Sequence, residues 1–475
     1  MSNYESSHLE VRSLMELIRH FNESFLQIAE GVLNCLDEGF DYSNFEVKLK
    51  DMLDGLGRKI CQDVLQHADE LIRKNRAERA GWNIERRDEQ KNILTPFGAI
   101  EYKRTYFVNK DTKQYAHLVD LMAGHGPHAR IDCALSSLLA ERAVESSYRK
   151  SGAAPSLFNR ETHVSGQTVM NTLRSFSAVA PVSPGPAEKR KVRFLYIEAD
   201  EDHVAAQKGR NMQVYLVYVH EGKEERNGRR QLINPRYFAG CYDSTEDLWY
   251  EVADYIAANY DLNSVEQFFI AGDGAAWIKS GLEIIPNSSY VLDRFHLAKY
   301  ITHAAGSDKS ARRAVWRAIK GADIVAVDRA LQELKAARPE REAAILKCWQ
   351  YIKNNWEGIE AYENHGAAQG CSAEGHVSHI LSARLSSRPR AWSKAGANQM
   401  AKLRVMQANG RSVREQYLAQ VPRSIGLMKV AEETVQAERR KLKKAFTESL
   451  LDNLPALRGK STFLTKALRG LCHPA

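Results

Sequence analysis

Acidic residues end two predicted strands, where carboxylates could hold divalent cations. Residues 192–200 (VRFLYIEAD) predict a strand that ends at Asp200, and residues 267–271 (QFFIA) predict a strand that leads into Asp273. Because the ends of neighbouring central strands lie close together in an open sheet, Asp200 and Asp273 are expected to face one site. Mg²⁺ is held by such carboxylates, waters and substrate phosphates. Two ions can activate the attacking water or 3′-hydroxyl and stabilise the leaving oxygen in phosphodiester chemistry.

A third acidic residue stands alone in a basic stretch. Residues 306–370 carry apolar side chains at helical spacing, which predicts an all-helical insertion. Directly after it, Glu374 is the only acidic residue between positions 374 and 409. A catalytic helix returning to the sheet would show such an isolated carboxylate. The alternative is an ordinary acid at a helix N-terminus, which the helix dipole stabilises.

The sequence pattern does not decide which acid of the first strand is the first metal ligand. Strand alternation puts Glu198, Asp200 and Asp202 on one face of the first strand. Each of the three is therefore a candidate for the first metal ligand. The alternative to a metal site is that Asp200 and Asp273 are solvated acids at strand ends.

Zinc and disulfide chemistry are less well supported. Cys371, His376 and His379 could be read as zinc ligands, but no fourth ligand stands at a suitable spacing. The seven cysteines are scattered and odd in number, so they form no disulfide framework. This usage favours a reducing compartment, and we expect a cytoplasmic protein.

The elements that must position these acids come in the order three strands, helix, strand, short helix, strand, helix. They are predicted over residues 192–200, 212–220, 232–241, 244–260, 267–271 and 290–292, with a last helix from near Phe295. This order matches the start of the ribonuclease-H-like fold of nucleases and DNA transposases. We therefore predict an α/β fold with a mixed-sheet catalytic domain in two parts, 192–305 and 371–425, interrupted by the helical insertion at 306–370.

The N-terminal part is expected to bind DNA. Residues 1–85 predict a helical segment and residues 86–130 a β-hairpin region, in which Tyr102, Arg104 and Tyr106 share a face. That face could contact DNA, or it could belong to a plain hairpin. Residues 131–177 resemble a helix-turn-helix, with a helix over 132–148, a break at Ser151-Gly152 and a second helix capped by Ser165. The alternative is a helical hairpin that has no role in reading DNA. The predicted reader residues are Gln167, Thr168, Asn171 and Arg174.

Positive charge is concentrated in the C-terminal part of the chain. A Pro- and Gly-rich linker is predicted at 178–191, and basic C-terminal helices at 426–475. Residues 371–475 hold 19 Lys and Arg against 7 Asp and Glu, while the whole chain of 475 residues carries a net charge of +8. This local excess favours a polyanion, with Arg384 and Arg388 as candidate DNA contacts. The sequence has no apolar run long enough for a membrane span and no secretory signal.

Several stretches resemble the ISLre-two family of bacterial insertion-sequence transposases, which is itself similar to the Mutator-like transposases. They are LYIEAD (195–200), GDGAAW (272–277), VLDRFHLAKY (291–300) and the segment 373–403, together with TPFGAIEYKRTYF (95–107), SYRK (147–150) and SGQTVMN (165–171). The resemblance implies an Asp-Asp-Glu enzyme with Asp200, Asp273 and Glu374 as metal ligands. It places the Asp-x-x-His element of the Mutator-like group on Asp293 and His296. Mutator-like enzymes often have Gly after the first Asp, where this chain has Glu201-Asp202.

His296 and Trp277 each have both a functional and a structural interpretation. His296 follows Asp293 by three positions on a helix, so the pair can meet on one face, either to orient the site or for structural reasons. Trp277 could stack on an unpaired base or pack beneath the site.

The sequence thus predicts a DNA transposase that binds terminal inverted repeats, cuts with two Mg²⁺ ions and joins the freed ends to target DNA. Mn²⁺ is expected to be able to replace Mg²⁺. Because two element ends are handled together, we expect a homodimer or larger assembly on double-stranded DNA. The alternatives are a domesticated DNA-binding regulator and a structure-selective nuclease that never joins ends.

Overall fold

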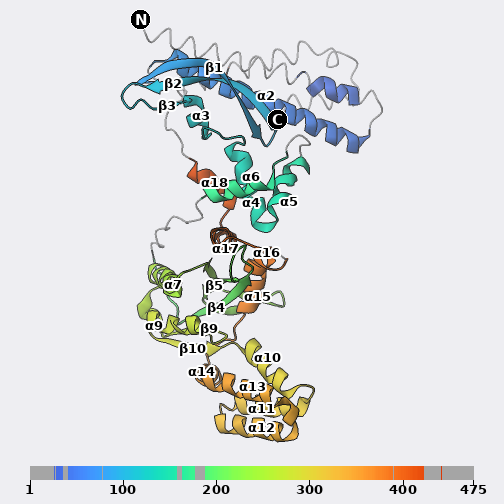
Figure 1. Cartoon of the computed structure of the whole chain (residues 1–475), viewed down its shortest axis with the longest axis vertical. Coiled ribbons are helices and arrows are strands. Elements are labelled where there is room, and N and C mark those ends of the chain that lie inside the picture. The colour runs from blue at the N-terminus through green and yellow to red at the C-terminus, as the bar shows by residue number, and fades with distance from the viewer. Residues whose placement is uncertain are drawn as a thin grey trace. The chain divides into compact units, whose positions relative to one another are not determined.

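The computed structural model describes residues 28–35, 41–76, 79–157, 163–176, 188–388 and 390–421, with positions 26 and 440 (Figure 1). The predicted basic helices at 426–475, apart from position 440, lie outside the described residues, as do most of the linker and of the first 41 residues. The described chain is a mixed α/β structure in two compact units. One holds the described residues up to Asn92 and Ile100–Ala129; the other holds Ile93–Ala99 and Arg130–Val421. In the part of the chain that is described, every helix is too short or too polar to cross a bilayer.

The first unit is a long helix against a small sheet. Helix α2 (Tyr42–Lys74) precedes strands β1 (Trp82–Thr95), β2 (Gly98–Asn109) and β3 (Tyr115–Ala116), which pair in that order, and helix α3 (Leu118–Ala123) follows. The carboxylate of Asp69 joins α2 to β2 because it accepts hydrogen bonds from the backbone N–H and the hydroxyl of Thr105, at 2.8 and 2.7 Å. A hairpin thus forms where the sequence predicts one.

The aromatic and basic face of this hairpin is mostly buried. The Tyr102 hydroxyl donates to Asp120 Oδ1 at 2.6 Å, and Arg104 forms an ion pair with the same carboxylate. Tyr102 is 2% exposed. These two side chains therefore serve the hairpin's own packing, as the plain-hairpin alternative expects.

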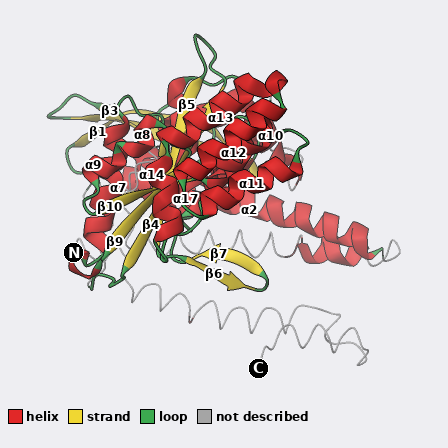
Figure 2. Cartoon of the chain, turned by 90° about the horizontal axis from the view of Figure 1, so that it is seen from below, coloured by secondary structure: helices red, strands yellow, loops and turns green. Residues whose placement is uncertain are grey.

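A five-stranded mixed sheet is the centre of the second unit. Its strands are β4 (Phe194–Val204), β5 (Met212–His220), β8 (Arg236–Gly240), β9 (Gln267–Gly272) and β10 (Ser288–Leu292), in the spatial order β10-β9-β4-β5-β8. Strands β4, β5 and β8 are antiparallel neighbours, whereas β4, β9 and β10 are parallel. Figure 2 shows β4, β9 and β10 side by side.

The strand predicted over 232–241 is wrong in its first half. Leu232 ends a short strand, β7 (Arg229–Leu232), which pairs only with β6 (Lys223–Arg226) in a separate hairpin. Asn227 and Gly228 both have positive φ, +54° and +70°, which suits a tight hairpin turn. Asn234, with φ +49°, then turns the chain before β8 begins.

Helices cover both faces of the sheet. One face packs on α7 (Thr245–Asn259), whose Trp249 is fully buried, and on the short helices α8 (Ala276–Lys279) and α9 (Gly281–Ile284). The other face packs on α15 (Ala373–Val377) and α17 (Lys394–Ala408). Between α15 and α17 the chain forms a π-helical turn at Ser378–Ser382 and the short helix α16 (Ala383–Leu385). Ser244 caps α7, because its hydroxyl accepts the Glu246 N–H.

A helical body lies between β10 and α15. It comprises α10 (Arg294–Ala305), α11 (Lys309–Lys320), α12 (Ile324–Ala337), α13 (Glu342–Asn354) and α14 (Trp356–Asn364). Helix α10 packs on α13, so the helical body begins before the predicted boundary at residue 306. Helix α14 packs on β10, where a Cβ atom on Gly358 would lie 2.5 Å from the Tyr290 ring.

Three helices form the predicted helix-turn-helix region. They are α4 (Cys133–Glu145), α5 (Tyr148–Ala153) and α6 (Gly166–Ser175), and a 3₁₀ turn at Ala154–Leu157 follows α5. The single helix predicted over 132–148 is wrong, because it breaks at Ser146-Ser147. The predicted break at Ser151-Gly152 is also wrong, because both residues lie inside α5. Gly152 instead allows close packing: a Cβ there would lie 2.0 Å from the Val164 carbonyl oxygen. The predicted cap Ser165 is confirmed. Helix α18 (Val413–Gln420) packs on α4.

Candidate active site at the strand ends

Asp200 and Asp273 lie near each other along two adjacent parallel strands. Asp273 directly follows β9, whereas Asp200 lies inside β4, which continues to Val204, so the prediction that the first strand ends at Asp200 is wrong. In the register of β4 and β9, Glu198 is paired with Ala271, so the next position facing the same way places Asp200 beside Asp273. Asp293 follows the third parallel strand, and its backbone N–H donates to the Gly272 carbonyl at 2.7 Å. Strands β9 and β10 are thus each followed directly by an aspartate, and their neighbour β4 carries Asp200 four residues before its end.

Asp200 is buried among other charges. It is 8% exposed, and among the described residues its carboxylate accepts a hydrogen bond from the backbone N–H of Glu201, at 2.9 Å. Burial raises the pKa of Asp200 to about 7, and the charges of Glu201 and Glu374 act in the same direction. The N–H of Glu201 and the charge of His296 oppose this shift. A site with this balance favours a cation or a proton.

Glu374 reaches this neighbourhood from a helix far along the chain. It is the second residue of α15, which packs against β4, and its side chain is exposed. Its charge adds to the rise in the pKa of Asp200, after burial and the charge of Glu201. The structure thus brings the first and third predicted acids into one region.

Asp293 and His296 meet as the sequence predicts. Asp293 caps α10 by accepting the Phe295 N–H at 2.9 Å, and its other oxygen lies 2.9 Å from His296 Nδ1. This hydrogen bond raises the pKa of His296; burial opposes the rise, and the charges of Asp293, Asp200 and Asp273 add to it. A protonated His296 would therefore partly neutralise the two strand-end aspartates.

The loop after β9 is held against the helical body. Asp273 Oδ1 accepts the Ala275 N–H at 2.8 Å, and the Tyr351 hydroxyl of α13 donates to the Asp273 carbonyl at 2.7 Å. Gly274 has φ +97°, and a Cβ there would lie 2.2 Å from Asn355 Oδ1. The helical body therefore fixes the backbone that carries Asp273.

Trp277 packs beneath the strand ends. Its indole N–H donates to Glu201 Oε2 at 2.8 Å, and its ring lies edge-on to Tyr215 at a centroid distance of 4.8 Å. These contacts favour the packing interpretation over base stacking. The Trp277 hydrogen bond also occupies the Glu201 carboxylate. Burial raises the pKa of Glu201 and the charge of Asp273 adds to the rise, whereas the Trp277 hydrogen bond opposes it.

The two other candidates for the first acid are occupied by protein partners. The Asp202 carboxylate accepts the Ser386 hydroxyl at 2.8 and 2.9 Å. Glu198, 2% exposed, accepts the backbone N–H and the hydroxyl of Ser372 and pairs with Lys223 at 2.6 Å. Of the three acids on this face, Asp200 is the one whose carboxylate is left for a ligand.

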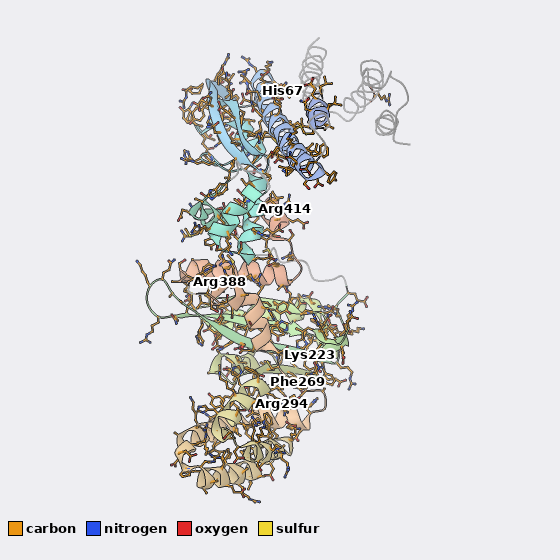
Figure 3. The ribbon with its side chains drawn as sticks, turned by 90° about the vertical axis from the view of Figure 1, so that its right-hand side faces the viewer. His67, Lys223, Phe269, Arg294, Arg388 and Arg414 are labelled. Carbon is orange, nitrogen blue, oxygen red and sulfur yellow. The ribbon has the colours of Figure 1, made fainter. Side chains whose placement is uncertain are left out.

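Sequence reasoning missed the residues around Glu198. His220 Nε2 lies 3.1 Å from Glu198 Oε1, and the Tyr218 hydroxyl donates to Glu198 Oε2. Burial works to raise the pKa of Glu198, but the bonds and charges of His220 and Lys223 overcome it and lower that pKa strongly. A local signal was available, because Asn227-Gly228 is typical of a tight hairpin turn and so indicates the strand β6, which begins at Lys223. Figure 3 labels Lys223 beside the central sheet.

The candidate zinc residues have other contacts. His376 Nδ1 lies 3.2 Å from the Tyr237 hydroxyl, and its ring packs on Tyr218. His379 is exposed, and burial raises the pKa of the Cys371 thiol well above its usual value.

The candidate DNA-reading residues separate into exposed and buried ones. Gln167, Asn171 and Arg174 are exposed on α6, and Gln167 donates to Asn171 at 3.1 Å. The Thr168 hydroxyl lies 2.9 Å from that of the cap, Ser165. Arg388 is exposed (Figure 3), whereas Arg384 is 5% exposed and donates from Nε to the Ala143 carbonyl at 2.9 Å.

The carboxylates of the site are suitable ligands for a hard cation, although they are not clustered at a metal-binding spacing. Carboxylate oxygens are the ligands that Mg²⁺ prefers. The raised pKa of Asp200 reflects burial first and the charges of Glu201 and Glu374 second, and a bound cation would offset both effects. Within the described residues, however, no three His, Cys, Asp or Glu side chains lie at a spacing that would hold a metal ion.

Comparison with known proteins places the chain in a family. The pattern of the family described as "Uncharacterised protein family (UPF0236)" matches residues 35–420. A UPF0236 protein of Caldanaerobacter subterraneus subsp. tengcongensis is 40% identical over 458 residues, covering 95% of this chain and 96% of the relative. Another from that organism is 39% identical with the same coverage. A protein of Streptococcus gallolyticus, named "UPF0236 protein in vanSb 3'region", is 26% identical over 412 residues, 84% of this chain and 86% of its own. The chain therefore belongs to the UPF0236 family.

Proposed function

We propose that this protein is a DNA transposase of the Asp-Asp-Glu type, with Asp200, Asp273 and Glu374 as its catalytic carboxylates. The observation that carries the proposal is the placement of Asp200 beside Asp273 on adjacent parallel strands, with Glu374 acting electrostatically on Asp200 from α15. The fold supports it: three antiparallel strands, a helix and two parallel strands follow in the chain order expected of a ribonuclease-H-like domain. The resemblance to ISLre-two and Mutator-like transposases points to the same three acids.

The three carboxylates would hold Mg²⁺, and when bound the ions would activate the attacking oxygen and stabilise the leaving one. Asp200 would supply its oxygens from β4 and Asp273 from the fixed loop after β9, while Glu374 comes from an exposed position and can move toward them. Each end of the element would be hydrolysed and its 3′-hydroxyl then joined to target DNA. The reaction needs no covalent protein intermediate.

His296 would support this site without being a metal ligand. Asp293 fixes the imidazole ring through Nδ1, and the site's aspartates favour its protonated form. An imidazolium at this place would hold a DNA phosphate close to the carboxylates through charge and hydrogen bonding.

The genomic distribution of relatives supports a mobile element. One UPF0236 relative has a name that joins eleven locus designations of one organism, and another joins four. A protein encoded at many positions of one genome is what an element that copies itself produces. For the present chain, this favours a transposase over a regulator maintained in a single copy.

DNA would be recognised by the α4–α6 region. Helix α6 presents Gln167, Asn171 and Arg174 outward, and such side chains can reach base edges or phosphates in a major groove. Because two element ends must be processed together, the active form would be a homodimer or larger assembly on DNA.

The test is excision and integration in cells of a marked element that carries the DNA flanking the native gene. Wild type should mobilise the marker, while Asp273→Asn and Glu374→Gln should abolish mobilisation and retain DNA binding. A matched control is Glu340→Gln, which changes an exposed acid on the helical body. If both site variants mobilise the marker as wild type does, the catalytic assignment is wrong. Cutting without joined product would identify a nuclease, and DNA binding without any cutting would favour a regulator.

A further inference from the structure

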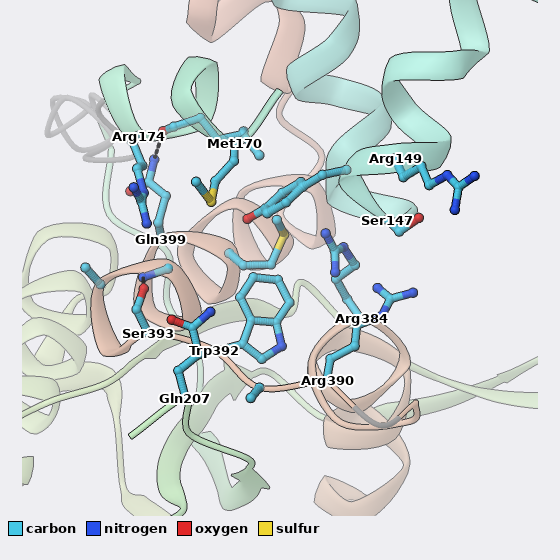
Figure 4. A pocket seen from close by; sticks show the side chains of 16 residues that line it. Ser147, Arg149, Met170, Arg174, Gln207, Arg384, Arg390, Trp392, Ser393 and Gln399 are labelled. Atoms are coloured by element: carbon cyan, nitrogen blue, oxygen red, sulfur yellow. Dashed lines mark hydrogen bonds between the residues drawn. The ribbon is translucent and has the colours of Figure 1, made fainter. Parts of the chain in front are cut away.

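A cavity of about 560 Å³ lies between the helix-turn-helix region and the segment 384–400 of the catalytic domain (Figure 4). This volume falls in the range of sites that bind ligands of nucleotide size. Helices α5 and α6 contribute Arg149 and Arg174, and the opposite wall contributes Arg384 and Arg390. Among the described side chains that line the cavity, none is acidic.

Arg384 is a buried cation in this cavity. Its guanidinium lies over the rings of Tyr148 and Trp392, at 5.3 and 4.9 Å from their centroids, and no described carboxylate forms an ion pair with it. Burial lowers its pKa to about 10, and the charges of Arg390 and Arg404 act in the same direction. A buried charge without a counter-charge is costly, so an anion in the cavity would relieve that cost.

The cavity walls are fixed in place. Gln399 of α17 donates from its amide nitrogen to the carbonyls of Leu173 and Phe176, at 3.2 and 2.6 Å, which ties α17 to the end of α6. The Trp392 indole N–H donates to the Leu385 carbonyl at 3.0 Å. The rim is open to solvent at Arg149 and Arg174, which are exposed.

We propose that this cavity binds a phosphate group of a DNA strand, with Arg174 and Arg390 as direct ligands and Arg384 as the buried charge behind them. The guanidinium fork matches the geometry of phosphate oxygens, and the excess of arginines favours a dianionic or polyanionic ligand. Arg384 lies ten residues after Glu374, and only a continuous helical stretch, α15 to α16, separates them. The site would therefore connect DNA held by the α4–α6 region to the helix that carries the third catalytic acid. This inference rests on the proposed function.

The test uses the full chain and a fluorescein-labelled DNA duplex, with anisotropy measured over a range of NaCl concentrations. The double variant Arg174→Ala/Arg390→Ala should weaken binding at least about tenfold. It should also lower the slope of log Kd against log[NaCl] by about two, because two phosphate contacts are lost. Arg313→Ala/Arg317→Ala, at two exposed positions of α11, is the charge-matched control and should change neither quantity. Arg384 is left intact, since its bond to the Ala143 carbonyl supports the fold.

The outcomes separate this inference from the proposed function. A folded double variant with wild-type affinity and salt slope would overturn the cavity as a DNA phosphate site. A free nucleotide is tested with dTMP: if dTMP raises the Tm of wild type but not of the double variant, while both bind duplex equally, the cavity serves a free nucleotide and the proposal fails. If wild type binds no duplex, the proposed transposase function fails as well.

Discussion

Glu198, in the middle of β4, accepts hydrogen bonds from both the backbone N–H and the hydroxyl of Ser372, the latter at 2.9 Å. Ser372 directly precedes α15, whose second residue is Glu374. The contact therefore joins the strand that carries Asp200 to the helix that carries Glu374. Lys223 balances the charge of Glu198, and the His220 ring lies within hydrogen-bond distance of it, so this acid sets the geometry of the site without belonging to it.

Replacing Glu198 by Gln should destabilise the fold strongly. Gln keeps the shape but leaves Lys223 without its buried counter-charge, and breaking one side of such a pair costs about 3–5 kcal/mol. Urea unfolding at neutral pH measures this loss. Tyr218→Phe is the matched control, since it removes the hydroxyl that bonds to Glu198 and Ser372 but leaves every charge in place, and it should cost less, about 1.5–3 kcal/mol. Equal losses in the two variants would show that the charge of Glu198 is unimportant.

Mg²⁺ should stabilise the protein through Asp200. The folded pKa of Asp200, about 7, lies above its unfolded value near 3.8, so its contribution to stability falls as the pH rises from about 4 to about 7. Asp200→Asn removes that ionisation and should raise Tm at pH 8 but not at pH 4. Added Mg²⁺ should raise Tm at pH 8 for wild type and not for this variant. An equal Mg²⁺ effect on both proteins would place the cation elsewhere.

Gly274 should be irreplaceable for two separable reasons. Gly274→Ala meets both an unfavourable backbone conformation, φ +97°, and the buried side chain of Asn355. Gly209 has φ +82°, and a Cβ added there would meet no atom within 4 Å, so Gly209→Ala measures backbone strain alone, about 1 kcal/mol. Urea unfolding should show a clearly larger loss for Gly274→Ala, part of which the added change Asn355→Ala recovers. If the two alanine variants lose equally, contact with Asn355 does not constrain the loop after β9.

The positions of Asp200 and Asp273 follow from local pattern. Each follows a run of mostly apolar residues long enough for a buried strand, although β4 continues past Asp200 to Val204, and parallel neighbours align their carboxyl ends at one edge of a sheet. The helix cap at Ser165 could also be predicted, because a serine hydroxyl accepts a hydrogen bond from a free N–H group at the start of a helix. These features depend on a few consecutive residues, so the sequence predicts them well.

What the sequence could not predict depends on tertiary contacts. Glu198 and Ser372 are 174 residues apart, and nothing near either one indicates the other. Ser151-Gly152 suggests a break on local propensity, yet both residues lie inside α5, where the Val164 carbonyl leaves no room for a Cβ on Gly152. Arg384 has the composition of a surface DNA contact, but Tyr148 and Trp392 bury it. In each case packing overrides the local signal.

The stability of the α4–α6 region should fall between about pH 4 and pH 6 because of Asp132. This aspartate caps α4 by accepting the Leu135 N–H at 2.6 Å, and burial raises its pKa to about 6 against the effect of that bond. The folded chain therefore holds the proton more tightly than the unfolded chain, and ionisation costs stability as the pH rises through this window. The cost is at most about 3 kcal/mol, and smaller because the side chain is only partly buried.

Asp132→Asn tests this dependence, because asparagine caps a helix as well as aspartate does and stays neutral. Thermal unfolding should show the variant to be more stable than wild type at pH 8 and equal to it near pH 4. Asp308, which is half-buried, caps α11, and its hydrogen bonds from Ala311 and Ser310 lower its pKa. Asp308→Asn should therefore give no gain at pH 8. A gain at pH 8 for both variants would mean that removing negative charge, rather than relieving the burial of Asp132, stabilises this protein.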